Sequence, residues 1–389
     1  MGVGGTIRRL VAAHGRGEVI DVVRRADADG LPLCVIGGGS NIVAGDDIFD
    51  GVVVRDLSRR VDVVSRTDDA VVLRVDAGMM WDDLVGLSVE RGLAGIEGLS
   101  GVPGTVGASV VQNIGAYGQS VSSSVCRVEA WDRPSGRVVV LTPSELRFGY
   151  RTSALKTSMY AAPAVPATHF FPTPRYVVLS VDLALESGGI GTVGYGQLAH
   201  ALGTEVGDRL PVREIRAAVL RVRATKGMLE DPHRYAIPVM AGMRDRSAVD
   251  AALEDMRRET GSDAQDADRH SCGSFFMNPV LSAAQAGGLP DDAPRFPVDA
   301  DGLGNGDGHA RVKTSAAWLI DHAGFHRGFR LSPDAPAALS SRHTLALTNR
   351  GGARAADVAA LATAVRDGVR GAFGVTLVPE PVLVGIGLD

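Results

Sequence analysis

The chain has 389 residues, of which 45% are hydrophobic and 22% are charged, and its formal net charge at neutral pH is -5. This composition excludes a chain dominated by disorder, and the length predicts about two or three domains. Acidic and basic residues are interspersed, so no basic face predicts a nucleic-acid partner.

Two further features narrow the class of protein. The three cysteines, Cys34, Cys126 and Cys272, are far apart, and none has the paired spacing of a zinc site or a redox dithiol. No apolar run reaches the ~18 residues that cross a bilayer, and residues 1–13 lack the pattern of a signal peptide. We therefore expect a cytoplasmic protein without a metal centre, membrane association or nucleic-acid partner.

The beginning of the chain predicts alternating helices and strands. Apolar residues among charges predict a helix over 17–29, and an apolar run predicts a strand over 31–36 that enters three glycines. Similar patterns predict strands over 51–54, 61–64 and 70–75 and a helix over 81–91. The stretch 92–118 is so dense in glycine that its backbone could approach a ligand closely.

The rest of the chain continues the mixed pattern. It predicts strands over 125–130, 138–141, 176–185, 345–348 and 381–386, and helices over 212–224, 316–323 and 355–373. A domain boundary is expected near Lys226, and the polar stretch 228–268 is interpreted as a linker or variable excursion. The segments 161–175 and 299–309 are interpreted as surface insertions.

Two glycine segments are candidate phosphate cradles. Residues 35–41 read VIGGGSN, and residues 102–109 read VPGTVGAS. Neither matches the G-x-G-x-x-G or Walker A pattern, but two segments whose backbone N–H groups can approach a diphosphate suggest a large dinucleotide. Tight turns and close packing remain the alternative for any single glycine.

Seven motifs occur in a fixed order along nearly the whole chain: GGGSN (37–41), GVPGTVGA (101–108), QNIGAYG (112–118), FGYR (148–151), GSFFMNP (273–279), KTSAAWLID (313–321) and PEP (379–381). Together they resemble the UDP-N-acetylenolpyruvoylglucosamine reductases of bacterial cell-wall synthesis. A coincidental match to all of them in this order is very improbable, whereas any one motif is weak.

The resemblance implies an α+β fold. A two-subdomain FAD-binding α/β module of the PCMH type, like that of vanillyl-alcohol oxidases, is expected over 1–226, with subdomains of about 1–57 and 58–226. A C-terminal α+β substrate domain is expected over 227–389, and the return of its last strand, about 376–389, to the FAD domain is left open.

The resemblance also implies an activity. NADPH would reduce a non-covalently bound FAD, which would reduce the enolpyruvyl ether of UDP-N-acetylenolpyruvoylglucosamine to UDP-N-acetylmuramate for peptidoglycan synthesis. Such enzymes are expected to be cytoplasmic monomers.

Three residues match the reacting groups of that family. Arg151 in FGYR matches the arginine that stabilises the anionic intermediate, because a planar guanidinium suits a carboxylate-like anion. Ser274 in GSFFMNP matches the general acid, and Glu380 in PEP matches a carboxylate near the same carbon. Outside these motifs, a surface salt bridge, a turn serine and a loop carboxylate would be the ordinary interpretations.

The resemblance further assigns binding residues. Lys226 would face the UDP diphosphate, while Tyr195 and Asn278 would contact the nucleotide sugar. The residues assigned to FAD are Gly37, Gly38, Gly39, Ser40, Asn41, Pro103, Gly104, Ala108, Gly115 and Arg223. Phe275 and Phe276 are interpreted as core residues. Arg342 and His343 lie near another contact region, and a surface role remains open for both.

Two alternatives from other classes remain. A flavin oxidase of the same superfamily could tether FAD covalently, with Cys34 as the nearby candidate. A non-catalytic nucleotide-sugar binder could retain the fold, although the presence of Arg151, Ser274 and Glu380 argues against it.

Overall fold

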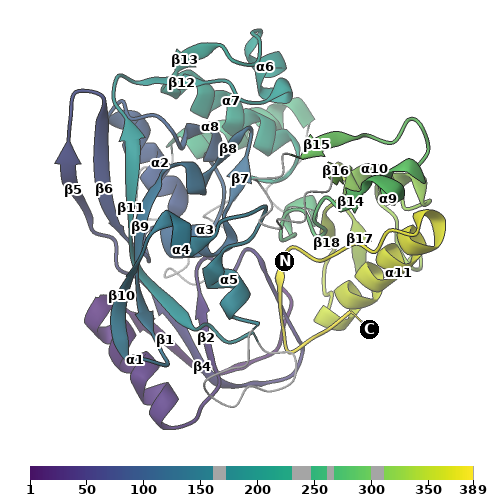
Figure 1. Cartoon of the computed structure of the whole chain (residues 1–389). Helices are drawn as coiled ribbons and strands as arrows, with labels where there is room; N and C mark the ends of the chain where they lie inside the picture. The colour runs from purple at the N-terminus through teal and green to yellow at the C-terminus, as the bar shows by residue number, and fades with distance from the viewer. Residues whose placement is uncertain (161–171, 230–246, 261–266, 299–310, 389) are drawn as a thin grey trace.

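The computed structural model describes residues 1–160, 172–229, 247–260, 267–298 and 311–388 (Figure 1). The largest sheet is five-stranded and antiparallel, and six sheets of two or three strands accompany it in the described residues. The C-terminal unit lies to one side of the large sheet (Figure 1). Within the described ranges, no helix combines the length and hydropathy required to cross a membrane.

The first unit is a small parallel sheet covered by one helix. Its strands are β1 (Ile7–Ala13), β4 (Phe49–Asp56) and β2 (Leu33–Ile36), in that spatial order. Helix α1 (Arg16–Ala28) connects β1 to β2 and buries Val19, Val22, Val23 and Ala26, which share one face at helical spacing. This face packs on Ala13, Leu33, Val52 and Val54 of the sheet. Strand β2 therefore has a fixed position, and the first glycine segment follows directly from its end.

The second unit is a five-stranded antiparallel sheet. Its spatial order is β10 (Arg137–Leu141), β9 (Val125–Asp132), β11 (Tyr176–Glu186), β6 (Ala70–Asp76) and β5 (Val61–Arg66). In β6, Val71, Leu73 and Val75 alternate inward, as a sheet with one buried face requires. Helices α2 (Trp81–Glu90) and α3 (Val106–Gln112) contribute to the same core, and the second glycine segment, 102–109, runs into the first turn of α3.

A helical layer follows this sheet. Helix α7 (Val212–Thr225) contacts α6 (Gly196–Leu202) and α8 (Ser247–Thr260). Helix α8 corrects the interpretation of 228–268 as a linker, because Val249, Ala252 and Leu253 pack against Leu220 and Ala224 of α7. The polar exposed face of α8 concealed this apolar stripe.

The C-terminal unit has its own core around helix α11 (Ala355–Phe373). Leu361 and Val365 of α11 are fully buried with Phe275, Phe276 and Leu319. The surrounding elements are β14 (Val280–Ser282), α9 (Ala283–Gly287), β15 (Phe296–Val298), β16 (Arg311–Lys313), α10 (Ala316–His322), β17 (Ala337–Leu339) and β18 (Leu347–Asn349).

The last strand leaves the C-terminal unit. Strand β19 (Val382–Val384) pairs in parallel with β3 (Ile42–Ala44), with Val382 opposite Ile42. The N-terminus lies against the C-terminal unit in turn, because the Met1 amine donates to the Ser271 carbonyl. The two ends of the chain therefore bring the first glycine segment, Glu380 and the GSFFMNP motif to one place.

Short elements complete the described chain: 3-10 turns at Glu97–Leu99, Val121–Ser123 and Ala267–Arg269, the hairpin β7 (Gly115–Ala116) and β8 (Gln119–Ser120), helices α4 (Pro143–Leu146) and α5 (Ala154–Ser158), and the pair β12 (Ile190–Thr192) and β13 (Arg209–Pro211).

Most predicted elements are confirmed, including α1, α2, α7, α10, α11 and the strands of the five-stranded sheet. The strand predicted over 345–348 begins only at Leu347, and that over 381–386 covers only Val382–Val384. Strand β1 was not predicted, because its residues are mostly exposed and its apolar run of four residues follows two arginines without alternation. The insertions at 161–175 and 299–309 lie largely outside the described residues.

Candidate active site

The two glycine segments touch through their backbones. A Cβ atom at Gly38 would lie 2.9 Å from the Gly104 Cα, and one at Gly37 would lie 2.7 Å from the Ala108 Cβ. Gly39 and Gly104 also have φ angles of +65° and +113°, which disfavour other residues. The segments therefore form one cradle that excludes side chains and exposes backbone.

This cradle borders an apolar cavity of about 170 Å³, here called the inner pocket. Apart from the cradle, its wall includes side chains from β2, α5, β11 and β19. Among them, burial raises the pKa of the Cys34 thiol to about 12, so this thiol stays protonated and poorly nucleophilic. Gly37, Gly38, Gly39, Gly104 and Ala108 all line the inner pocket, as do Ser40, Asn41 and Pro103.

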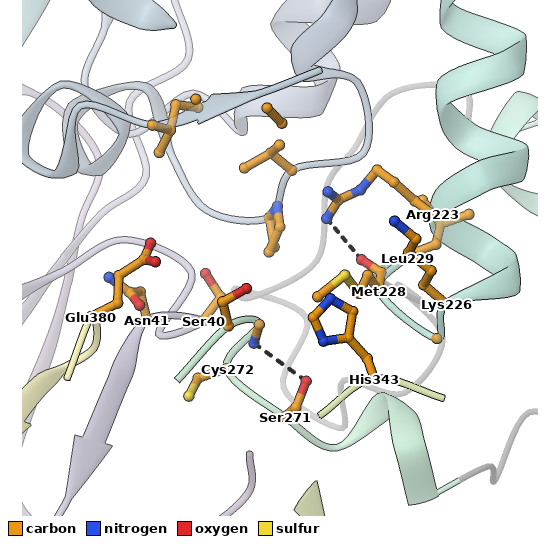
Figure 2. Close-up of a pocket in the computed structure, with 18 of the residues that line it drawn as sticks. Ser40, Asn41, Arg223, Lys226, Met228, Leu229, Ser271, Cys272, His343 and Glu380 are labelled. Carbon is orange, nitrogen blue, oxygen red and sulfur yellow. Dashed lines mark hydrogen bonds between the residues drawn. The ribbon is translucent and has the colours of Figure 1, made fainter. Parts of the chain in front are cut away.

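A larger cavity of about 360 Å³, the outer pocket, lies next to it (Figure 2). The two cavities share five lining residues, Ser40, Asn41, Pro103, Gln112 and Ile114. A long ligand can therefore extend from the cradle into the outer pocket. Among the other predicted site residues, the outer pocket is lined by Gly115, Arg151, Tyr195, Arg223, Lys226, Ser274 and Glu380.

The charged residues in the wall of the outer pocket are mainly cationic. Arg151, Arg223, Lys226 and Arg269 contribute positive charge, and Glu380 is the only carboxylate among its described lining residues. A concave site with this charge balance attracts anionic ligands such as a diphosphate or a carboxylate.

Arg151 and Glu380 form an ion pair at one end of the outer pocket. The Arg151 Nε lies 3.0 Å from Oε1 of Glu380, and the two side chains are only 21% and 16% exposed. The Arg151 Nη2 donates to the Gly115 carbonyl, and Gln112 Nε2 donates to the same Glu380 oxygen at 3.1 Å. The guanidinium and the carboxylate are thus held by partners on different segments.

The backbone of the FGYR motif sets the direction of Arg151. Its φ angle is +54°, and Gly149 and Thr152 exchange two backbone hydrogen bonds around it at 3.0 and 3.2 Å. The Tyr150 ring lies beneath the guanidinium, 5.5 Å from Cζ, and the Lys313 Nζ lies 5.2 Å from the same ring. Two cations on one ring are a cation-π arrangement that stiffens this corner of the site.

Asn278 is the one predicted site residue that lines neither pocket in the described structure. Its Oδ1 accepts a hydrogen bond from the Ala316 N–H at 2.9 Å, and its backbone and side chain are hydrogen-bonded to the Tyr150 hydroxyl. Asn278 therefore connects the start of α10 to Tyr150, the tyrosine beneath Arg151. Its backbone amide and its side-chain amide both have their partners in these two places.

Ser274 and Glu380 are brought together by a short ladder. The Glu380 N–H donates to the Phe275 carbonyl at 2.8 Å, and the Met277 N–H donates to the Val378 carbonyl at 3.0 Å. Phe275 and Phe276 are almost fully buried beneath this ladder, which confirms their assignment to the core. The ladder presents Ser274 and Glu380 to the same cavity.

The opposite end of the outer pocket holds Arg223 and Lys226 (Figure 2). The Arg223 guanidinium donates to the carbonyls of Gly101 at 3.1 Å and Met228 at 2.8 Å. The Lys226 Nζ donates to Gln197 Oε1 at 2.6 Å, and burial together with Arg223 lowers the pKa of Lys226. In these contacts both cations donate to neutral oxygens, and both line the same cavity.

Tyr195 reaches this end of the pocket from the start of α6. Its ring packs edge to face on Tyr117, with centroids 6.1 Å apart, although Tyr195 itself is 49% exposed. An exposed aromatic ring on a pocket rim can close over a bound base or sugar. Tyr117 belongs to the QNIGAYG motif, but nothing in that motif distinguished its ring from a core residue.

His343 contributes a neutral ring to the outer pocket. Burial, Lys226 and Arg327 lower the pKa of His343 to about 4. The Leu345 N–H donates to Nδ1 at 3.0 Å, so the proton of the neutral ring lies on Nε2. Figure 2 shows the ring beside Met228 and Lys226, which favours the pocket over a surface role for this histidine.

One buried residue near Glu380 was not predicted. Lys156 in α5 donates to Gln112 Oε1 at 2.7 Å and to the Glu380 carbonyl at 3.2 Å. Its only sequence signal is a lysine in a short polar segment, which has no periodicity to mark it as buried. In the described ranges no group of His, Cys, Asp or Glu residues is arranged to hold a metal ion.

Comparisons with known proteins agree across the whole chain. Residues 7–142 match an FAD binding domain, and residues 265–384 match the C-terminal domain of UDP-N-acetylenolpyruvoylglucosamine reductase. Proteins with that name from Leifsonia xyli and Thermobifida fusca are 42% and 40% identical to it, and the alignments cover 100% of this chain and 97% and 96% of those relatives.

A solved structure also matches. The UDP-N-acetylenolpyruvylglucosamine reductase from Thermus caldophilus superimposes with a TM-score of 0.54 at 23% identity, over 96% of this chain and 91% of that chain. This likeness supports the fold, in which the matched FAD binding domain precedes a smaller α+β unit.

Proposed function

The chain belongs to the UDP-N-acetylenolpyruvoylglucosamine reductase family, and from this premise we propose that Arg151, Ser274 and Glu380 carry out its reaction in the outer pocket. The protein is an FAD-dependent oxidoreductase that uses NADPH to reduce UDP-N-acetylenolpyruvoylglucosamine to UDP-N-acetylmuramate, a step in the synthesis of peptidoglycan precursors.

The inner pocket and its cradle fit FAD. The contact of Gly38 with Gly104 leaves only backbone on the cradle, as the close approach of a diphosphate requires. The connection of the inner to the outer pocket provides the length that a dinucleotide needs. When bound, FAD supplies a ring that accepts hydride from NADPH and passes it to the substrate. The residues that hold it in this proposal are Gly37, Gly38, Gly39, Ser40, Asn41, Pro103, Gly104, Ala108, Gly115 and Arg223.

Arg151 stabilises the charge that develops on the substrate. Hydride arrival at C3 of the enolpyruvyl group spreads negative charge over C2 and the carboxylate. A guanidinium held by Gly115 and by stacking on Tyr150 can meet this anion without reorganisation. Its pairing with Glu380 keeps the guanidinium in place before the substrate binds.

Ser274 supplies the proton that C2 then requires. A hydroxyl is a weak acid, so this role depends on a strongly basic carbanion and on close placement. The ladder between the GSFFMNP segment and residues 378–380 supports that placement, because it bonds Glu380 to Phe275, the residue that follows Ser274. Glu380 organises Arg151 and the serine side of the pocket.

The other end of the outer pocket takes the nucleotide. Lys226 provides a point charge for the diphosphate, and Tyr195 covers the nucleotide sugar from the rim. Asn278 acts indirectly in this proposal, since it holds Tyr150 beneath Arg151.

The domain division also remains a proposal. We place the FAD-binding domain at 1–226, with subdomains of about 1–57 and 58–226, and the substrate domain at 227–389. The pairing of β19 with β3 supports the return of the last strand to the FAD-binding domain. A monomer in the cytoplasm is the state we propose.

The reductase assignment is tested with the purified protein. A yellow protein that oxidises NADPH only when UDP-N-acetylenolpyruvoylglucosamine is present is the expected result. A colourless protein that does not take up added FAD would overturn the proposal. Retention of the colour by the polypeptide after acid denaturation would instead support an oxidase with tethered flavin, and ligand binding without turnover would support a non-catalytic binder.

A further inference from the structure

Lys156 is a buried cation at the back of the outer pocket. It lies in the short helix α5 and is only 9% exposed. Its Nζ is 2.7 Å from Gln112 Oε1, 3.2 Å from the Glu380 carbonyl and 3.5 Å from the Arg151 carbonyl. One side chain thus contacts the backbones of two proposed reacting residues and the amide that bonds one of them.

The lysine determines the orientation of the Gln112 amide. A lysine amino group with its proton bound only donates hydrogen bonds, so Gln112 must present its oxygen to Lys156. Its NH₂ group then faces Glu380 Oε1, at 3.1 Å. A reversed amide would place an NH₂ group against the ammonium and an oxygen against the carboxylate, and both contacts would be repulsive.

This arrangement gives hydrogen-bond and ion-pair partners to only one of the two carboxylate oxygens of Glu380. Oε1 receives the Gln112 NH₂ group and lies 3.0 Å from the Arg151 Nε. Within the described residues, Oε2 has no hydrogen-bond partner, and Figure 2 shows the carboxylate directed toward the interior of the outer pocket. The carboxylate is therefore fixed in rotation with one oxygen available to a ligand.

A buried ammonium is costly, and its retention here needs a compensating interaction. Burial lowers the pKa of Lys156 to about 8, an effect that Arg151 reinforces and Glu380 opposes. Simple packing would be served by an apolar side chain at this position. The hydrogen bonds to Gln112, Arg151 and Glu380 are what distinguish lysine from such a replacement.

We propose that Lys156 is a positioning residue that acts through Gln112 to hold the Glu380 carboxylate beside Arg151 for reduction of the enolpyruvyl substrate. This inference rests on the proposed function. Lys156 is not among the described residues that line either pocket, so its loss affects the step that uses Glu380 rather than the reduction of the enzyme by NADPH.

The test measures the two half-reactions separately by stopped-flow spectroscopy of the holoenzyme. K156M should slow flavin reoxidation by UDP-N-acetylenolpyruvoylglucosamine by roughly tenfold or more, a loss of about 1.4 kcal/mol, while flavin reduction by NADPH changes by less than about twofold. Gln112→Leu should reproduce this selective loss. T157A, at the exposed neighbouring residue of α5, is the matched control and should leave both rates unchanged.

A double-mutant cycle separates positioning from general stability. If Lys156 acts through Gln112, the K156M and Q112L double variant reoxidises no more slowly than Q112L alone. Additive losses, or equal falls in both half-reactions and in the melting temperature, would overturn the inference. If K156M fails to fold, two other results provide the same test. Q112L should show the selective loss, and the rate of the wild-type substrate step should decline above about pH 8, whereas that of Q112L should not.

Failure of the inference differs from failure of the proposed function. A wild-type protein whose reduced flavin is not reoxidised by the UDP-enolpyruvyl sugar overturns the proposed function and the inference with it. A wild type that turns over beside an equally fast Q112L variant overturns the inference alone.

Discussion

The Nε of Arg151 lies 3.0 Å from Oε1 of Glu380, although the two residues come from the middle and the end of the chain. The contact is an ion pair, and each partner also has a hydrogen bond of its own: Arg151 donates to the Gly115 carbonyl, and Glu380 accepts from the Gln112 amide. The pair therefore joins the FGYR motif to the segment just before β19. A substrate carboxylate that binds the guanidinium must approach it from the side that Glu380 leaves open.

Loss of the Arg151 charge should affect the chemical step most. R151A is expected to lower kcat by about 10²–10³, the cost typical of removing a preorganised donor from a developing anion. R151K should recover part of this loss, since an ammonium keeps the charge but lacks the planar fork. Steady-state kinetics measure both variants. R137A, at the exposed end of β10, is the control, and equal losses in it would contradict a specific role for Arg151.

Ser274 should be required only after hydride has reached the substrate. S274A is expected to slow flavin reoxidation by the substrate by about 10²–10⁴, the range of general acid catalysis, and to leave reduction by NADPH unchanged. Single-turnover measurements of the two half-reactions provide the test. If S274A loses both half-reactions equally, the serine has a structural role instead.

Local features of the chain were predictable because their physics is local. The spacing of Val19, Val22, Val23 and Ala26 determines one buried helical face, and the prediction of this helix is confirmed within one residue. The alternation in β6 is likewise a property of seven consecutive residues. The glycine segments were found for the same reason, since a run of three glycines is visible without any tertiary contact.

Long-range features were not predictable in this way. The partners of Lys156 come from α3 and from residue 380, and no sequence pattern relates them. The position of Asn278 outside the pocket depends on the hydroxyl of Tyr150 and on the start of α10. The apolar stripe of helix α8 becomes evident only from its packing against α7, because many charged residues are interspersed along the same helix.

The contact between the glycine segments should be intolerant of a methyl group. In G38A the added Cβ would lie 2.9 Å from the Gly104 Cα, so one backbone must move and the cradle opens. We expect loss of bound FAD, measured as the ratio of visible to ultraviolet absorbance after purification. G17A is the matched control, because no atom lies within 4 Å of a Cβ there and alanine favours the helix. Full FAD content in G38A would contradict a close backbone approach.

Lys156 should titrate well below an ordinary lysine. The chain has three lysines, Lys156, Lys226 and Lys313, so NMR of protein labelled at the lysine side chains can follow each signal, and K156M assigns one of them. We expect a pKa near 8 for Lys156. Between this value and the ordinary lysine pKa of 10.5, the unfolded chain binds more protons than the folded protein. The stability of the fold therefore decreases as the pH falls from 10.5 to about 8, because the buried amine must then carry a charge. A titration above pH 10 would contradict burial of the charge.

His343 should make the protein sensitive to mild acid. Its pKa is lowered from 6.5 to about 4, so the unfolded chain binds more protons than the folded protein between these values. The contribution of this histidine to stability is therefore complete above about pH 6.5 and is lost as the pH falls toward 4.

In H343N the amide oxygen can still accept from the Leu345 N–H, but the titrating group is gone. We expect the melting temperature of H343N to fall less steeply than that of the wild type between pH 6.5 and 4, whereas H200N, at an exposed site, should follow the wild type. Parallel curves for H343N and the wild type would mean that the ring accepts a proton in the folded protein as readily as in the unfolded chain, and that the outer pocket gains a positive charge in acid.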